Sequence, residues 1–203
     1  TGRSITIEKD TTVPITSTTF QNGNYYKNNF LFNLWTNEEL QKATINYTLL
    51  RTGLSTITGS GRDPQNNISA AGLSNDVVYV TLNYYAVDWA GDAVGQPEHN
   101  TEVTQTKVAV IDRELPTINA VSVIAPATVG IGGQITVNFT LYDKSGLLVL
   151  SDPIQVSIGG VVTQVAGNGC ANTPYVVPRS ITGAEANRNI IVTATDRAGN
   201  TNT

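Results

Sequence analysis

The chain has 203 residues and a formal net charge of -4, and only 14% of its residues are charged, so its surface must be rich in hydroxyl and amide groups. Its 12 lysines and arginines are scattered, which argues against a nucleic-acid-binding protein. No run approaches the roughly 20 apolar residues of a membrane span. Because the chain starts with Thr1-Gly-Arg-Ser, which is neither an initiator methionine nor a signal peptide, we expect a processed or excised segment of an exported protein.

Short β-branched and aromatic runs bounded by Gly, Asn, Asp and Pro fill the sequence, and helical periodicity is almost absent. This pattern predicts an all-β sandwich fold. Residues 1–9 are predicted to contain a separate strand, Ser4-Ile-Thr-Ile-Glu8, with no strand before it to pair with. The segment Asp10–Pro14 then interrupts the pairing, because Pro14 has no amide hydrogen.

A first domain is predicted over residues 10–111. Its predicted strands are 15–20, 29–36, 43–50, 54–58, 77–87 and 102–111. The polar stretch 59–76 is predicted to be a long loop, since it contains Gly59, Gly61 and Pro64. Strand 77–87 shows the clearest alternation, and its predicted inward residues are Val78, Val80, Leu82, Tyr84 and Ala86.

A second domain is predicted over residues 112–203. It begins with Asp112–Pro116, which repeats the Asp-to-Pro spacing of Asp10–Pro14 after 102 residues. Its predicted strands are 117–124, 134–142, 153–158, 161–165, 174–181 and 189–195. The last strand alternates, and its predicted inward residues are Ile190, Val192 and Ala194.

Two similar turns, Val87-Asp-Trp-Ala-Gly-Asp92 and Thr195-Asp-Arg-Ala-Gly-Asn200, each close a predicted strand, and each domain starts with an Asp-to-Pro segment. These motifs resemble the tandem immunoglobulin-like domains of prokaryotic cell-surface proteins, namely large adhesins and surface-layer proteins. The resemblance covers essentially the whole chain and implies two tandem immunoglobulin-like β-sandwiches at the cell surface. Such domains mostly serve as stalks, spacers and walls, and a subset in pili and threads joins subunits by donating a strand.

The two ends of the chain suggest strand donation. The turn after Asp88 leads to the strand 102–111, whereas the turn after Asp196 leads to no further strand, so the second domain is predicted to lack its last strand. An open sheet edge presents unpaired backbone groups and invites a strand. We therefore expect copies of the chain to join head to tail. The donor residues are Ser4, Ile5, Thr6, Ile7 and Glu8, and the acceptor residues of the next copy are Ile190, Val192 and Ala194.

One feature of the alignment between the two domains does not fit this hypothesis. With Asp10 aligned on Asp112, Ile5 and Ile7 fall on Lys107 and Ala109 and not on Val108 and Val110. Because a slip of one residue exchanges the two faces of a strand, a bulge or an offset is expected in the donor strand.

The expected function is that of a structural subunit of an extracellular cell-surface filament, with an adhesive role toward a ligand on cells or in the matrix. The alternative is a repeat segment from the stalk of a giant adhesin or surface-layer protein, with the same junction inside one polypeptide. An enzyme is not expected, because His99 is the only histidine and no nucleophile turn surrounds it.

The Asp-x-Ala-Gly turns have a structural and a metal-binding interpretation. In the first, the aspartate accepts hydrogen bonds from turn amides and Gly91 or Gly199 supplies a positive φ. In the second, calcium is bound by oxygen ligands at the domain joint. The candidate ligands are Asp88, Asp112 and Glu114, together with Asp196 and a neighbouring copy's Asp10. Calcium apart, no cofactor is expected.

Three Asn-x-Ser/Thr sequons offer candidate glycosylation sites at Asn46, Asn67 and Asn138. Asn46 and Asn138 lie within predicted strands, where only an outward-facing side chain can be modified. Asn67 lies in the predicted 59–76 loop and is therefore the best-placed candidate.

Overall fold

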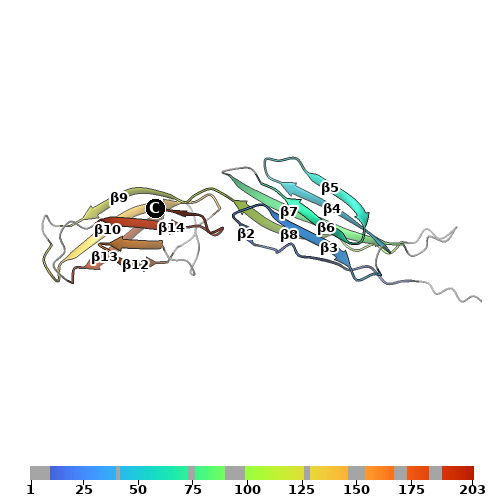
Figure 1. Cartoon of the computed structure of the whole chain (residues 1–203), viewed down its shortest axis with the longest axis horizontal. Helices are drawn as coiled ribbons and strands as arrows, with labels where there is room; N and C mark the ends of the chain where they lie inside the picture. Colours follow the sequence, from blue (N-terminus) through green and yellow to red (C-terminus); the bar gives the residue numbers. More distant parts are fainter. Residues whose placement is uncertain are drawn as a thin grey trace, which may run out of the picture. The chain divides into compact units, whose positions relative to one another are not determined.

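Only β-strands and their connections occur among the residues that the computed structural model describes, which are 10–39, 42–72, 76–89, 99–125, 129–145, 154–166, 173–182 and 189–203 (Figure 1). The predicted all-β fold is therefore confirmed. The chain divides into two compact units. The first unit contains most of residues 10–111, and the second contains residues 112–203 with the short pieces 25–27 and 76–77. None of the described segments is a helix of the length and apolar character needed to cross a membrane.

The strands of residues 10–111 form two sheets (Figure 1). The sheet with the order β1-β3-β6 contains Thr16–Thr18, Phe30–Thr36 and Gln65–Ala70. The sheet with the order β2-β8-β7-β4-β5 contains Tyr25–Tyr26, Gln105–Asp112, Val77–Asp88, Ala43–Arg51 and Ile57–Arg62. The residues of β7 that were predicted to face inward are all buried, namely Val78, Val80, Leu82, Tyr84 and Ala86.

Both of these sheets supply fully buried side chains to the core of the first unit. Phe32 and Leu34 come from β3, and Ile45 and Leu49 come from β4. Phe20, just after β1, packs edge-on against Phe32 with 5.3 Å between ring centroids. Each such side chain contributes about 1.5–3 kcal/mol of burial free energy, so two sheets with one apolar face each form a stable sandwich.

The prediction of a long loop over residues 59–76 is wrong, because β5 (Ile57–Arg62) and β6 (Gln65–Ala70) occupy most of it. A Cβ atom at Gly59 would lie 2.2 Å from the ring of Tyr47 on the neighbouring β4, so glycine is needed there for close packing. Glycine was taken as a loop signal, whereas here it lets a strand pass an aromatic side chain. Asn67 consequently lies on a strand, with a φ of 56° beside a register shift between β3 and β6.

The second unit is also built from two sheets (Figure 1). The sheet with the order β13-β10-β9 contains Thr173–Ser180, Gln134–Tyr142 and Thr117–Ile124. The sheet with the order β12-β11-β14-β15 contains Val161–Val165, Ile154–Ile158, Ile190–Thr195 and Thr201–Asn202. One apolar core unites residues from both sheets, including Phe139, Tyr175, Val156, Val192 and Ala194. Val192 and Ala194 are buried as predicted, and Ile190 packs partly buried against the same core.

The two units have matching strand orders. In each three-stranded sheet the middle strand, β3 or β10, is the second of the three in chain order. In the other sheet of each unit, β5-β4-β7-β8 corresponds to β12-β11-β14-β15. The correspondence places β15, which has two residues, where β8 has eight.

The side chains of β8 alternate differently from the sequence prediction. Ala109, Val110 and Ile111 are all buried, whereas Val108 is 46% exposed, so the expectation that Val108 and Val110 both face the core is wrong for Val108. Lys107 is half-buried, and its Nζ donates a hydrogen bond to the Phe20 carbonyl oxygen at 3.2 Å. Lys107, Ala109 and Ile111 therefore share one face of β8 that faces the core, and Val110 on the opposite face is buried as well.

Candidate functional site

A pair of residues closes the strand-ending turn in each unit. In the first unit, Asp88 Oδ1 accepts a hydrogen bond from the Asn100 N–H at 2.9 Å, and Asp88 Oδ2 accepts one from Asn100 Nδ2 at 2.7 Å. Asn100 Nδ2 also donates to the carbonyl oxygen of Asp10 at 3.3 Å. The pair therefore connects the end of β7 to the segment before β1.

The second unit contains the same arrangement. Asp196 Oδ1 accepts from the Asn200 N–H at 2.8 Å, Asp196 Oδ2 accepts from Asn200 Nδ2 at 2.7 Å, and Nδ2 also donates to the Asp112 carbonyl oxygen at 3.0 Å. The Ala198 N–H donates to Asp196 Oδ1 at 2.8 Å, and Gly199 has a φ of 86°. Asp196 therefore accepts hydrogen bonds from turn amides, as the structural interpretation of the turn predicts. Its asparagine partner was not predicted from the sequence.

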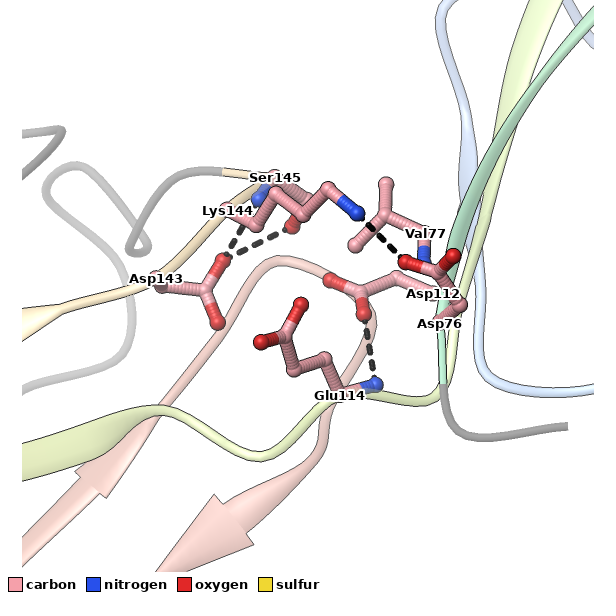
Figure 2. Close-up of polar contacts among 7 residues, drawn as sticks. All are labelled: Asp76, Val77, Asp112, Glu114, Asp143, Lys144 and Ser145. Carbon is pink, nitrogen blue, oxygen red and sulfur yellow. Dashed lines mark hydrogen bonds and ion pairs between the residues drawn. The ribbon is translucent and has the colours of Figure 1, made fainter. Parts of the chain in front are cut away.

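Three buried carboxyl groups meet in the second unit, and we call Asp112, Asp143 and Asp196 the acidic cluster. Each offers an oxygen, and these oxygens all lie within 4.8 Å of one another. Asp112 ends β8, Asp143 directly follows β10, and Asp196 directly follows β14, so three separate strand ends position them. Figure 2 shows the carboxyl group of Asp112 facing that of Asp143, with the carboxyl group of Glu114 beside both.

Backbone amides orient the carboxyl groups of Asp112 and Asp143, as Figure 2 shows. Asp112 Oδ1 accepts a hydrogen bond from the Glu114 N–H at 2.9 Å. Asp143 Oδ1 accepts from both the N–H and the Oγ of Ser145, each at 2.9 Å. Asp112 Oδ2, in contrast, is buried and has no hydrogen-bond partner among the described residues. Because a buried polar atom is costly when left without a partner, this oxygen favours a positively charged partner.

Burial raises the pKa of the Asp196 carboxyl group. Its hydrogen bonds with Asn200 act in the opposite direction, and the neighbouring Asp112 and Asp143 charges raise the pKa further. Lys144 is next to Asp143 in sequence, but its Nζ binds Asp76 Oδ1, and the two side chains are 45% and 41% exposed. The cluster therefore favours either a bound cation or a shared proton over three free negative charges.

The structure brings together some of the five predicted calcium ligands and separates others. Asp112 and Asp196 belong to the acidic cluster, Glu114 is not one of its three members, and the third member, Asp143, was not predicted. Asp88 was predicted to bind the ion together with Asp112 and Glu114. It belongs to the first unit, its carboxyl group is hydrogen-bonded to Asn100, and it is not a member of the acidic cluster. Asp10 is exposed, and its Oδ1 accepts from the Thr12 N–H.

An incompletely paired sheet edge lies beside β14. Residues Ile190–Thr193 pair with β11 on one side. On the other side, β15 pairs only with Ala194 and Thr195, and the described residues provide no strand next to Ile190–Thr193. The predicted acceptor residues Ile190, Val192 and Ala194 thus lie on or beside this edge, which we call the open edge. The predicted donor residues Ser4, Ile5, Thr6, Ile7 and Glu8 lie outside the described residues.

The three sequon asparagines differ in exposure. Asn46 on β4 is half-buried, and its Oδ1 accepts a hydrogen bond from Ser60 Oγ at 2.8 Å. Asn138 on β10 is half-buried, and its Oδ1 is enclosed without a hydrogen-bond partner among the described residues. Asn67 is exposed, so it remains the most accessible of the three side chains.

An open polar depression lies beside β4, β5 and β7 of the first unit, and the sequence reading did not identify it. Its lining includes Asn46, Tyr47, Ser60, Asn83 and Tyr85. The described lining residues contribute hydroxyl, amide and phenol groups, and no carboxyl, imidazole or thiol group. This chemistry suits hydrogen bonding and ring stacking with a hydroxylated ligand.

The chain matches no protein-family model, no curated protein and no solved structure. Its two units nevertheless allow an internal comparison, because they share a strand order and a turn-closing Asp–Asn pair. They differ at the open edge and at the acidic cluster. These two differences are the features from which a function can be inferred.

Proposed function

We propose that the chain is a structural module of an extracellular cell-surface filament, built from two immunoglobulin-like β-sandwiches. The second sandwich is completed by a β-strand of the kind found in residues 3–9, supplied by the next copy. The observation that carries this proposal is the open edge: β14 has a strand beside Ile190–Thr193 on only one side among the described residues, whereas the corresponding β7 lies between β4 and β8.

The first unit indicates which sequence suits the open edge. Residues 3–9 correspond to 105–111 in the 102-residue repeat, and most of β8 lies in that range. In this alignment Ile5 and Ile7 match Lys107 and Ala109, which have the core-facing phase of β8. The exposure of Val108 removes one of the two mismatches from which a bulge in the donor strand was expected, whereas the buried Val110 retains the other.

The energetics favour a durable joint. Each backbone hydrogen bond contributes about 0.5–1.5 kcal/mol net, and each buried isoleucine contributes about 1.5–3 kcal/mol. Several such bonds together with Ile5 and Ile7 exceed the free energy of a transient contact. A contact between the front of one copy and the rear of the next is heterologous, so it propagates as a filament.

The alternative is that the same joint occurs inside one polypeptide, with this chain as a repeat segment of an adhesin or surface-layer stalk. Both versions place a strand of the same kind in the open edge, and they differ only in the covalent connection. Mass spectrometry of native material after denaturation separates them. A separate subunit has a mass near 21.6 kDa before modification, whereas a stalk segment belongs to a far larger chain.

An adhesive role is included in the proposal because of the polar depression beside β4, β5 and β7. Its hydroxyl, amide and tyrosine groups fit a hydroxylated ligand such as a cell-surface or matrix saccharide. Binding of the full chain to a saccharide array, compared with a Tyr85→Ala variant, tests this role. Equal binding by both proteins would show that the polar depression does not bind the saccharide.

The test of strand complementation uses two variants of the full chain that place the same charge on opposite faces of the donor strand. Ile7→Asp puts a carboxylate on the face expected to enter the core, and Thr6→Asp puts one on the outer face. We expect Ile7→Asp to abolish filaments in electron micrographs and Thr6→Asp to retain them. Filaments of equal abundance and length from both variants would contradict strand complementation through residues 3–9.

A further inference from the structure

We propose that the acidic cluster of Asp112, Asp143 and Asp196 is a binding site for a divalent cation, and that the ion it selects is calcium. All three residues belong to the second unit. Binding therefore does not depend on strand donation between copies, and it adds an inorganic ligand to a protein proposed to act as a structural module.

The geometry of the cluster fits one ion. Oxygens that bind calcium lie about 2.3–2.6 Å from the ion, so any two of them are at most about 5 Å apart. The three carboxyl oxygens of the cluster lie within 4.8 Å of one another, which is inside this limit. They come from the ends of β8, β10 and β14, so an ion between them would connect three strand ends.

The second observation is the state of Asp112. Its side chain is fully buried, and Oδ2 has no hydrogen-bond donor among the described residues, although Oδ1 is held by the Glu114 N–H. Figure 2 shows this carboxyl group facing that of Asp143. A buried carboxylate oxygen directed at other carboxylates lacks a positive partner, and a cation in the space between them supplies one.

The surrounding groups favour calcium over a transition metal. The cluster offers only carboxylate oxygen atoms as ligands. Calcium accepts six to eight oxygen ligands in flexible arrangements, whereas zinc prefers nitrogen and sulfur ligands. The nearby ammonium group of Lys144 is bonded to the exposed Asp76, so it does not take the place of the ion.

Among its described residues, the first unit lacks the complete set of ligands. It has the turn-closing Asp88 and a match for Asp112 in Asp10, but Asn37 follows β3 where Asp143 follows β10. Asn37 Oδ1 accepts a hydrogen bond from the Ile15 N–H at 2.7 Å. Asp10 is exposed, in contrast with the fully buried Asp112. Among the described residues, such a group of three carboxylates therefore occurs only in the second unit.

The experiment titrates the full chain with CaCl₂ after chelator treatment, near neutral pH, by isothermal calorimetry and thermal melting. Asp143→Asn removes one charged ligand while retaining an acceptor for Ser145. Glu39→Gln removes one exposed carboxylate of the first unit and is the matched control. We expect one calcium ion per chain, a higher melting temperature with calcium, about tenfold or greater weakening by Asp143→Asn, and no weakening by Glu39→Gln.

Two further measurements show which unit is stabilised by calcium. Both tryptophans, Trp35 and Trp89, lie in the first unit, so their fluorescence during urea unfolding should not change with calcium. Hydrogen exchange in peptides covering 143–145 and 196–202 should slow on calcium addition. If Asp143→Asn does not fold, terbium luminescence of the wild-type chain, displaced by calcium, replaces the affinity comparison.

Three results would overturn the proposal. The first is the absence of stoichiometric calcium or terbium binding to the wild-type chain, which would mean that the cluster shares a proton. The second is equal calcium affinity in the wild-type chain and a folded Asp143→Asn variant. The third is displacement of calcium by an equal concentration of magnesium, which would exclude the stated selectivity.

Discussion

The two units end their central strands with the same Asp–Asn hydrogen bonds, but different groups surround those bonds. In the first unit the next strand, β8, has eight residues, and the segment before it contains the buried Glu102. In the second unit β15 has two residues, and a third buried aspartate lies close by. The comparison indicates that the turn-closing pair is common to both units, whereas the residues around it differ between them.

The largest expected effect in this comparison is that of Glu102→Ala. Glu102 accepts hydrogen bonds from the Thr16 N–H at 3.0 Å, from Thr16 Oγ1, and from the Ala86 N–H at 3.1 Å, and so connects β1 to β7. Loss of these charge-assisted bonds in a buried site should lower the unfolding free energy of the first unit by about 3–4 kcal/mol. Urea unfolding followed by tryptophan fluorescence measures it.

The matched change in the second unit is Asn202→Ala. Asn202 is half-buried, and its Nδ2 donates one hydrogen bond, to the Pro116 carbonyl oxygen at 2.9 Å. We expect a loss of only about 1 kcal/mol. An Asn202→Ala effect as large as that of Glu102→Ala would mean that the two residues have equivalent roles, and the comparison would be wrong.

The turn-closing pairs give the next largest effect. Asn200 is buried and bonds to Asp196 and Asp112, so Asn200→Ala should destabilise the second unit by about 2–3 kcal/mol. Asn100 is half-buried, and Asn100→Ala should destabilise the first unit by about 1 kcal/mol. Hydrogen exchange of strand amides in each unit measures the two values separately, and the reverse order would contradict the role assigned to burial.

A smaller effect is expected at Gly59. Alanine there would bring a Cβ atom to 2.2 Å from the Tyr47 ring, and the ring must move to relieve the clash. We expect a loss of about 1–2 kcal/mol in the first unit, read by tryptophan fluorescence. The corresponding edge strand β12 contains three valines and no glycine, so the equally small change Val162→Ala should cost less than about 1 kcal/mol. A neutral Gly59→Ala variant would show that close packing does not explain the glycine.

The smallest effect concerns the pH dependence of the first unit. Burial raises the pKa of Glu38 above 4.5, and the charges of Asp10 and Asp88 raise it further. The folded state therefore holds this proton more tightly than the unfolded state, and the contribution to stability falls as pH rises through the raised pKa. At pH values above the raised pKa of Glu38, Glu38→Gln should raise the urea concentration at the unfolding midpoint of the first unit. At pH values below 4.5, the variant and the wild-type chain should have the same midpoint. A midpoint difference independent of pH would contradict this assignment.

Strands rich in β-branched residues and bounded by turn residues could be predicted from the sequence, and the bounds of 117–124, 134–142 and 161–165 agree with β9, β10 and β12. Val108 was misplaced because residues 108–111 are all apolar, so composition does not reveal which of them face the core. The strands within 59–76 were missed because the reason for Gly59 is a contact with another strand, β4.

The candidate site was only partly predictable for a similar reason. Asp112 and Asp196 belong to motifs that occur twice in the chain, whereas Asp143 has an asparagine as its counterpart in the first unit. Only the pairing of strands shows that its carboxyl group meets the other two. The asparagines of the turn-closing pairs had a signal that was not used, because Asn-Thr follows each turn, at 100–101 and at 200–201.

Hydrogen–deuterium exchange of β14 tests the central proposal, strand complementation at the open edge, most directly. We predict that the outward-pointing amides of Ile190–Thr193 exchange at least about tenfold more slowly in filaments than in the unassembled Ile7→Asp chain. Amides of the opposite edge strand, β12, should exchange at the same rate in both samples. Unchanged exchange at Ile190–Thr193 on filament formation, or equal slowing of β12, would contradict the proposal.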